Sequence, residues 1–98
     1  YLSDMSKDLD AARLILYKAA WTKENNNKEL NKLSSMAKYF CTNAAQRHST
    51  NAVQIHGGTG LNENSYVARA YRDAKVLEIY EGTNEIQKLI IAKELKLN

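Results

Sequence analysis

A glutamate between a tyrosine and a glycine is the side chain best suited to acid–base chemistry in this 98-residue sequence. Glu81 lies in the run IYEGT, residues 79–83, and a tight loop of this kind between two helices can direct a carboxylate into a cleft. Apolar neighbours such as Ile79 would desolvate the carboxylate and move it towards useful basicity near neutral pH. The alternative is an ordinary solvated loop acid, and spacing alone leaves both interpretations open.

Glycine occurs at only four positions, all in two short loops. Gly57, Gly58 and Gly60 lie in QIHGGTG, residues 54–60, and Gly82 follows the glutamate. Adjacent glycines after a helix expose backbone N–H groups that can approach a phosphate or pyrophosphate, and Gln54 can add a side-chain amide. The alternative is a helix C-cap and turn. The run is neither a Walker loop nor a dinucleotide fingerprint, because no strand precedes it and the spacing differs.

The residues after the second loop have the composition of a helix N-terminus. Thr83, Asn84 and Glu85 open the last expected helix, where free N–H groups and the helix dipole favour anions. Asn84 is predicted to be the N-cap, and Gln87, three residues on, would complete a capping box. The same residues can cap the helix and also contact an anion.

The remaining reactive side chains favour structural roles. His48 and His56 lack a second ligand four residues away, so no metal site is predicted. Cys41 is the only cysteine, which excludes an intramolecular disulfide and predicts a small core residue. The adjacent Arg72 and Asp73 are interpreted as a structural pair bracing the third helix.

Helices must position these residues, since the sequence has no proline and is rich in Ala, Leu, Lys and Glu. Three asparagines, residues 25–27, interrupt the first helical pattern and indicate a polar connector. The second expected helix is too long for a free-standing miniature domain and normal for a bundle within a larger protein. The expected helices are 2–23, 31–56, 65–77 and one that begins near residue 84.

Apolar periodicity predicts which side chains face the core. On the first helix these residues recur at alternating steps of three and four, as in a coiled-coil seam. The residues expected to face inward are Leu2, Met5, Leu9, Ala12, Leu16 and Ala19 on the first helix, Leu33, Ala37, Phe40 and Ala44 on the second, Val67, Tyr71 and Ala74 on the third, and Ile86, Leu89, Ile90 and Leu97 on the last.

Composition excludes several classes of function. The net charge of +3 is mild and Lys and Arg are scattered among acids, so no basic stripe indicates nucleic-acid binding. No apolar run approaches the roughly 20 residues that span a bilayer. The length allows one small domain. Because the sequence begins at Tyr1 and enters helical periodicity at once, we expect a piece of a longer protein.

Three runs taken together are far more specific than any one alone. AVQIHGGTG (52–60), YRDAK (71–75) and IYEGTNEIQ (79–87) resemble the C-terminal region of acyl-CoA dehydrogenases, and the 27-residue interval from Gln54 to Glu81 fits that family. The earlier DAAR (10–13) and YKAAW (17–21) resemble its preceding long helices. The resemblance covers essentially the whole chain, which corresponds to about a quarter of a full-length member.

The resemblance implies an all-α fold, an up-and-down bundle of about four helices that follows an N-terminal helical domain and a middle β domain. Members bind FAD, form tetramers built as dimers of dimers, and oxidise a fatty acyl-CoA to the trans-2-enoyl-CoA in β-oxidation. They pass electrons to an electron-transfer flavoprotein. The implied location is the mitochondrial matrix or the bacterial cytoplasm.

The resemblance also assigns a catalytic role. Glu81 stands at the position of the base that removes the α-proton while the β-hydrogen leaves as hydride to the flavin. Its backbone N–H would donate to the thioester oxygen, which is stabilisation by a preorganised donor. Gly82 would leave room for the thioester, so both residues belong to the implied substrate site. A glutamate here indicates the short-, medium- or short-branched-chain type.

Five further positions are implied to contact the cofactor. Gln54 and Gly58 correspond to residues on the ADP half of FAD bound mainly by a neighbouring subunit, and Gly57 would shape that turn. Thr83 and Glu85 correspond to positions near the flavin nucleotide.

Two departures from the family pattern occur, and two other classes of protein stay open. Tyr66 stands where many relatives have proline, and Glu85 where some have glutamine. An acyl-CoA oxidase shares the fold and base, and a non-catalytic helical assembly module is the other alternative. We expect the isolated chain to be inactive and to self-associate through its apolar helix faces.

Overall fold

The computed structural model describes residues 1–96, which form four α-helices, one short 3₁₀-helix and no strand. The all-α prediction is confirmed, and the expected helix bounds agree with the observed ones to within a few residues. Leu97, expected to face inward, lies outside the described residues. The elements are α1 (Leu2–Glu24), α2 (Leu30–His56), η1 (Gly57–Leu61), α3 (Tyr66–Leu77) and α4 (Asn84–Glu94).

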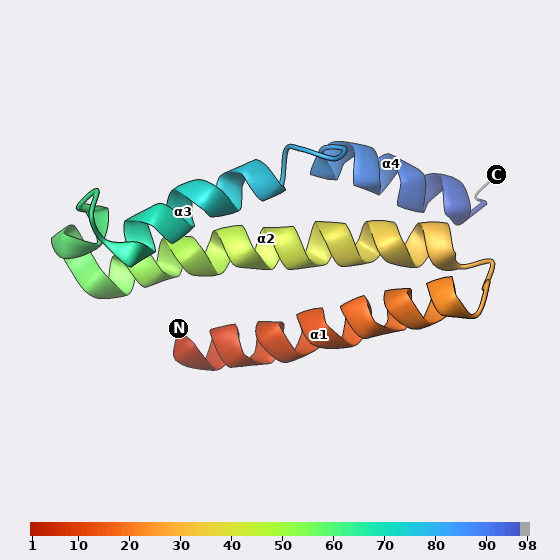
Figure 1. The fold of residues 1–98 in the computed structure, drawn as a ribbon, viewed down its shortest axis with the longest axis horizontal. Coiled ribbons are helices and arrows are strands. Elements are labelled where there is room, and N and C mark those ends of the chain that lie inside the picture. The colour runs from red at the N-terminus through yellow and green to blue at the C-terminus, as the bar shows by residue number, and fades with distance from the viewer. Residues whose placement is uncertain (97–98) are drawn as a thin grey trace.

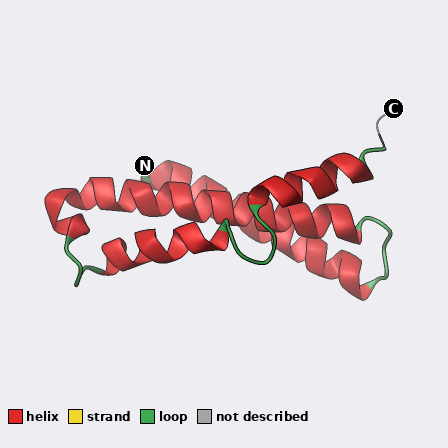
Figure 2. Ribbon diagram, turned by 90° about the horizontal axis from the view of Figure 1, so that it is seen from above, coloured by secondary structure: helices red, strands yellow, loops and turns green. Residues whose placement is uncertain are grey.

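The longest helix, α2, is the centre of the fold. α1 packs antiparallel along one side of it, and α3 and α4 follow one another along the other side (Figure 1). Over the described residues α1 makes no close contact with α3 or α4, so the bundle is open. Figure 2 shows the loop between α3 and α4 projecting to one side of the helices.

Local polar contacts explain where the first two helices end. The Asn25 side chain donates to Trp21 O at 2.9 Å, and the Asn27 side chain accepts from the Glu29 N–H at 2.9 Å. These bonds compete with helix continuation and make the predicted connector. α2 ends at Gly57, whose φ of +65° lies in the left-handed region that glycine adopts without strain.

The hydrophobic core is small and made mostly of alanine. The helices approach closely but bury little apolar area, and the chain exposes 7193 Å². A globular monomer of 11.1 kDa would expose about 5,700 Å². The radius of gyration is 15.6 Å, against about 13 Å for a compact chain of this length. The buried apolar residues are Ala19, Leu33, Ala37, Ala44, Ala68 and Ala74.

Apolar periodicity therefore identified the apolar faces of the helices but not what covers them. It is confirmed for the buried Ala19, Leu33, Ala37, Ala44 and Ala74, while Met5, Ala12, Val67 and Ile90 are half-buried. It is wrong for residues whose side chains are exposed, because no element among residues 1–96 covers the outer faces of the helices. These are Leu2, Leu9, Leu16, Phe40, Tyr71, Ile86 and Leu89.

Two further predictions concern side-chain partners. The pairing of Arg72 with Asp73 is wrong: the Asp73 carboxylate lies 3.6 Å from Arg69 Nε, one helical turn away, because adjacent helical residues do not face each other. Cys41 is half-buried between α1 and α2, and its thiol donates to Ala12 O at 3.7 Å. Burial raises the pKa of the Cys41 thiol.

One buried charge joins α1 to α2. The Asp8 carboxylate accepts hydrogen bonds from His48 Nε2 at 2.7 Å and from the Arg47 guanidinium. The bond from His48, supported by Arg47 and Lys7, holds the pKa of Asp8 below its ordinary value despite burial. His48 is thus engaged by a carboxylate. Across residues 1–96 no group of three or more His, Cys, Asp or Glu side chains is placed to hold a metal ion.

Candidate functional site

The loop between α3 and α4 contains an unusual backbone conformation. Glu81 has φ +56° and the following Gly82 has φ +89°. A non-glycine residue in the left-handed region is strained and persists only where its surroundings over-determine it. Among the described residues only Asn26 and Lys96 share this feature, and both follow a helix end. The strain marks the Glu81 loop as a candidate functional site.

The side chain of Glu81 is exposed, as are those of its neighbours Ile79 and Tyr80. The expected desolvation by Ile79 is therefore wrong for this chain alone, because the Ile79 side chain is 52% exposed and no described element covers the loop. The carboxylate is free to meet a ligand from outside the chain.

Two polar side chains fix the backbone of this loop. Lys38 Nζ, from α2, donates to Gly82 O at 2.9 Å and to Asn84 Oδ1 at 2.9 Å. Gln87 Nε2, from α4, donates to Gly82 O at 3.2 Å and to Glu81 O at 3.4 Å. Gly82 O is thus bonded from both α2 and α4, and Glu81 O is bonded from α4. Lys38 is 44 residues from Gly82 in sequence, and sequence reasoning missed it.

The start of α4 corrects the capping prediction. Thr83, not Asn84, is the N-cap, and its hydroxyl accepts from the Ile86 N–H at 3.3 Å. Asn84 is the first helical residue and is buried, and its side-chain amide donates to Thr42 Oγ1 at 3.0 Å. The predicted capping box is wrong, because the Gln87 side chain bonds the loop carbonyls instead.

The glycine loop at the end of α2 presents accessible backbone. An added Cβ at Gly57 or Gly58 would meet nothing within 4 Å, and the Gln54 side chain is exposed. Gly60 differs, since a Cβ there would lie 3.0 Å from Val53 O. Gly57 and Gly58 therefore leave open the space that a phosphate group needs for close approach, whereas Gly60 serves packing.

The structure brings some predicted site residues together and separates others. Thr83 and Glu85 adjoin Glu81 and Gly82 at the start of α4. The group formed by Gln54, Gly57 and Gly58 lies at the far end of α3, a helix about 18 Å long (Figure 1). One chain therefore presents two separate candidate contact regions for a large ligand.

The two regions offer different groups to a ligand. The open glycine backbone leaves room for a phosphate group. At the N-terminus of α4 the helix dipole favours an anion, but the N–H groups of Asn84 and Ile86 already donate to Glu78 O and Thr83 Oγ1. Tyr39, Lys75, Thr83, Glu85 and Lys88 contribute to a polar hollow of about 180 Å³ beside the second region.

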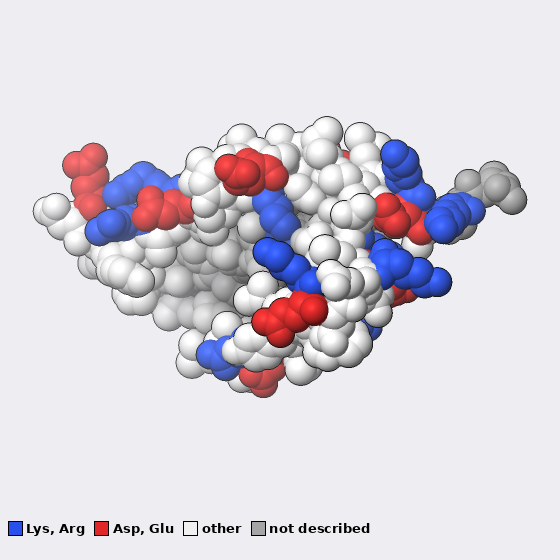
Figure 3. All heavy atoms as spheres, turned by 45° about the vertical axis from the view of Figure 1, so that its right-hand side comes forward, with Lys and Arg blue, Asp and Glu red and all other residues white. Residues whose placement is uncertain are grey.

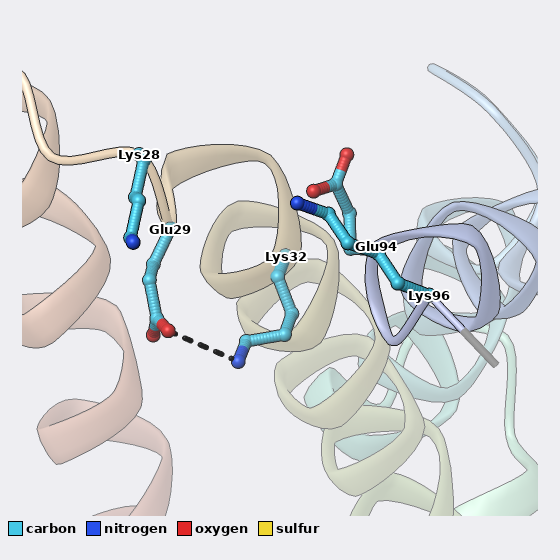
Figure 4. A pocket seen from close by; sticks show the side chains of 5 residues that line it. All are labelled: Lys28, Glu29, Lys32, Glu94 and Lys96. Carbon is cyan, nitrogen blue, oxygen red and sulfur yellow. Dashed lines mark hydrogen bonds and ion pairs between the residues drawn. The ribbon is translucent and has the colours of Figure 1, made fainter.

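Two further surface features among the described residues show no comparable arrangement. A hollow of about 130 Å³ is lined by Lys28, Glu29, Lys32, Glu94 and Lys96, where Lys32 pairs with Glu29 at 3.4 Å (Figure 4). On the face drawn in Figure 3, Lys and Arg alternate with Asp and Glu and form no continuous basic stripe. No described helix combines the length and apolar character needed to cross a bilayer.

A family model described as "Acyl-CoA dehydrogenase, C-terminal domain" matches residues 1–96, and the chain belongs to this family. The predicted resemblance is confirmed. An acyl-CoA dehydrogenase of Bacillus subtilis (strain 168) is 50% identical over 96 residues, which are 96% of this chain and 24% of that protein. The chain thus spans about a quarter of the curated relatives it matches.

Solved structures give the same fold. Butyryl-CoA dehydrogenase from Megasphaera elsdenii superposes with a TM-score of 0.90 at 42% identity, over 96% of this chain and 24% of that one. The prolyl acyl carrier protein oxidase AnaB superposes with a TM-score of 0.90 at 40% identity, over 98% of this chain and 25% of that one. The chain is thus similar to proteins named as dehydrogenases and to one named as an oxidase, and the fold alone does not separate them.

Proposed function

We propose that this chain is the C-terminal helical domain of a longer FAD-dependent acyl-CoA dehydrogenase, in which Glu81 is the general base. The observation that carries the proposal is the conformation of Glu81: a strained, left-handed backbone, an exposed carboxylate, and flanking carbonyls fixed by Lys38 and Gln87. Restraining the backbone that carries a carboxylate limits where the carboxylate can lie, and proton abstraction requires a positioned base.

In the proposed reaction Glu81 takes the proton from the carbon next to the thioester carbonyl of a fatty acyl-CoA. Loss of that proton places negative charge on the thioester oxygen. The backbone N–H of Glu81 makes no hydrogen bond within residues 1–96 and is available to donate to that oxygen. Gly82, without a side chain, leaves space beside it. A bound flavin would supply the acceptor for the hydride that leaves the neighbouring carbon.

The FAD site is proposed to be shared between copies of the protein. The ADP half of one FAD would be held by Gln54, Gly57 and Gly58. Thr83 and Glu85 would lie near the flavin nucleotide of another FAD. The separation of these regions by α3 supports sharing. So does the surface that the chain exposes beyond that of a typical monomer of its mass. The proposed assembly is a tetramer built as a dimer of dimers.

The proposed substrate class is a short- to medium-chain or short-branched acyl-CoA, with electrons passed to an electron-transfer flavoprotein. The bacterial relatives favour the bacterial cytoplasm over the mitochondrial matrix. The similarity to a protein named as an acyl carrier protein oxidase favours one alternative, an oxidase that passes electrons to oxygen. Hydrogen peroxide formation during turnover in air would distinguish the oxidase from the dehydrogenase.

The test uses the full-length, FAD-loaded protein and its Glu81→Gln variant, which keeps the shape of the side chain and removes the base. Butyryl- or octanoyl-CoA is added anaerobically, and loss of the oxidised-flavin absorbance is followed. We expect Glu81→Gln to bind acyl-CoA but to be reduced about 10²- to 10⁴-fold more slowly. Glu63→Gln, at an exposed glutamate elsewhere, is the matched control.

Each alternative has its own outcome. Equal reduction rates in wild type and Glu81→Gln would show that another residue is the base. No reduction by any acyl-CoA, with FAD bound, would favour the non-catalytic assembly module. Reduction by the isolated 98-residue chain supplied with FAD would contradict the expectation that this domain is inactive alone.

A further inference from the structure

The side chain of Lys38 reaches from α2 to the loop that carries the proposed base. It is half-buried, and its ammonium group donates two hydrogen bonds of 2.9 Å, to Gly82 O and to Asn84 Oδ1. Gly82 directly follows Glu81, and Asn84 begins α4. One cation thus ties the end of the loop and the start of α4 to the central helix.

A polar network fixes Lys38 in this position. Asn84 Nδ2 donates to Thr42 Oγ1 at 3.0 Å, which turns Asn84 Oδ1 towards Lys38. Thr42 lies one turn beyond Lys38 on α2, and its hydroxyl donates to Lys38 O at 2.7 Å. Thr42 and Lys38, both on α2, therefore hold Asn84 Oδ1, and charge-assisted bonds such as those from Lys38 are stronger than neutral ones.

The loop needs such a restraint. Gly82 has φ +89° and, lacking a side chain, would move easily between conformations, while Glu81 at φ +56° would relax towards an ordinary conformation. Gln87 also restrains the loop, with longer bonds of 3.2 Å to Gly82 O and 3.4 Å to Glu81 O. The shortest bond to the loop is the one from Lys38.

We propose that Lys38 is a positioning residue for the base: by binding Gly82 O and Asn84 Oδ1, it keeps the Glu81 backbone in the conformation that presents the carboxylate to the substrate. This proposal rests on the proposed function of Glu81. In this proposal Lys38 acts on the thioester only through the loop, so its removal slows proton transfer without removing the base.

The test isolates the proton-transfer step. The full-length, FAD-loaded protein is held with its flavin reduced, so that hydride transfer is blocked, and is mixed with saturating butyryl-CoA in D₂O. Glu81 takes the α-proton, exchanges it with solvent and returns a deuteron, so no electron acceptor is needed. Mass spectrometry of butyryl-CoA gives the rate of deuterium uptake. Acyl-CoA affinity, FAD content and thermal midpoint are measured on the same samples.

Four variants make the comparison specific. Lys38→Met keeps side-chain length and removes the cation, and we expect exchange at saturation to slow about 10- to 100-fold with acyl-CoA affinity unchanged. Lys38→Arg, which can donate to both acceptors, should restore most of the rate. Lys32→Met removes a charge from the same helix, at a lysine that pairs with Glu29 (Figure 4), and should exchange like wild type. Glu81→Gln sets the rate without the base.

The outcomes separate the two proposals. If Glu81→Gln exchanges as fast as wild type, the assignment of the base is wrong and the role of Lys38 fails with it. If Glu81→Gln abolishes exchange but Lys38→Met retains the wild-type rate per FAD-loaded molecule, the positioning role alone is overturned. Should Lys38→Met fail to fold, Lys38→Gln keeps one donor and should show an intermediate rate. A wild-type rate in that variant would overturn the positioning role equally.

Discussion

Replacing Gly82 by alanine tests whether the loop geometry is as constrained as the hydrogen bonds indicate. Gly82 has φ +89°, and an added Cβ would lie 2.8 Å from Gln87 Nε2. The Gln87 side chain is buried, so its amide can move away only by giving up its bonds to Glu81 O and Gly82 O. Gly82→Ala therefore adds backbone strain and breaks the Gln87 bonds together.

The two contributions can be estimated separately. Placing a non-glycine residue in left-handed backbone costs about 1 kcal/mol, and losing the Gln87 bonds costs about 1 kcal/mol. Gly82→Ala should then lower the free energy of unfolding by about 2 kcal/mol and Gln87→Ala by about 1 kcal/mol. In the double variant Gln87→Ala has already removed the bonds, so Gly82→Ala adds only the backbone strain. Its loss should also be about 2 kcal/mol, about 1 kcal/mol less than the sum of the single variants.

The assay is urea unfolding of the 98-residue chain, followed by the circular dichroism of its helices. All four proteins are compared at one protein concentration, because self-association would make stability depend on concentration. Additive losses in the double variant would show that Gln87 does not restrain the loop. An unchanged unfolding free energy in Gly82→Ala would show that the loop does not need its left-handed conformation.

Two further predictions concern stability. Gly60→Ala should lower the free energy of unfolding by about 1–3 kcal/mol in the same urea assay, because its Cβ would lie 3.0 Å from the backbone oxygen of Val53. Gly58→Ala, whose Cβ meets open space, should stay within about 0.5 kcal/mol of wild type. Equal losses in the two variants would contradict the geometry. Because hydrogen bonding to His48 holds the pKa of Asp8 below 3.8, this carboxylate stabilises the fold fully above that pH and progressively less as pH falls below it. Asp8→Asn should therefore flatten the acid limb of the pH–stability curve, and an unaltered limb would refute that role.

Local signals in the sequence were sufficient for the elements and for the two loops. The asparagine run at residues 25–27 and the glycine at residue 57 act on the backbone next to them, and the structure ends α1 and α2 there. The glutamate loop was predicted for the same reason, since Gly82 and Thr83 are residue types that favour a turn and a helix N-terminus. The strain at Glu81 itself has no signature in residue types and needed the backbone angles.

Long-range partners were not predictable in this way. The bond from Lys38 to Gly82 O depends on how α2 lies against the α3–α4 loop. The sequence around a lysine on a helix does not indicate a partner 44 residues away. Asn84 was misassigned as an N-cap because its residue type suits that role locally, whereas its buried contacts with Lys38 and Thr42 decide its position. The exposed leucines of α1 show the same limit, since periodicity identifies a face but not what covers it.

The central helix links the two candidate regions mechanically. Lys38 holds the base loop, and Gln54, 16 residues later on the same helix, begins the glycine loop, so the two lie about 24 Å apart along α2. An uninterrupted helix is stiff, and neither proline nor glycine occurs within α2. The distance between the proposed base and the proposed pyrophosphate contact is therefore set by helix geometry rather than by the loops. A cofactor bound between copies of such a chain would contact two regions at a fixed separation. A kink in α2 would change that separation without replacing any residue that contacts the cofactor.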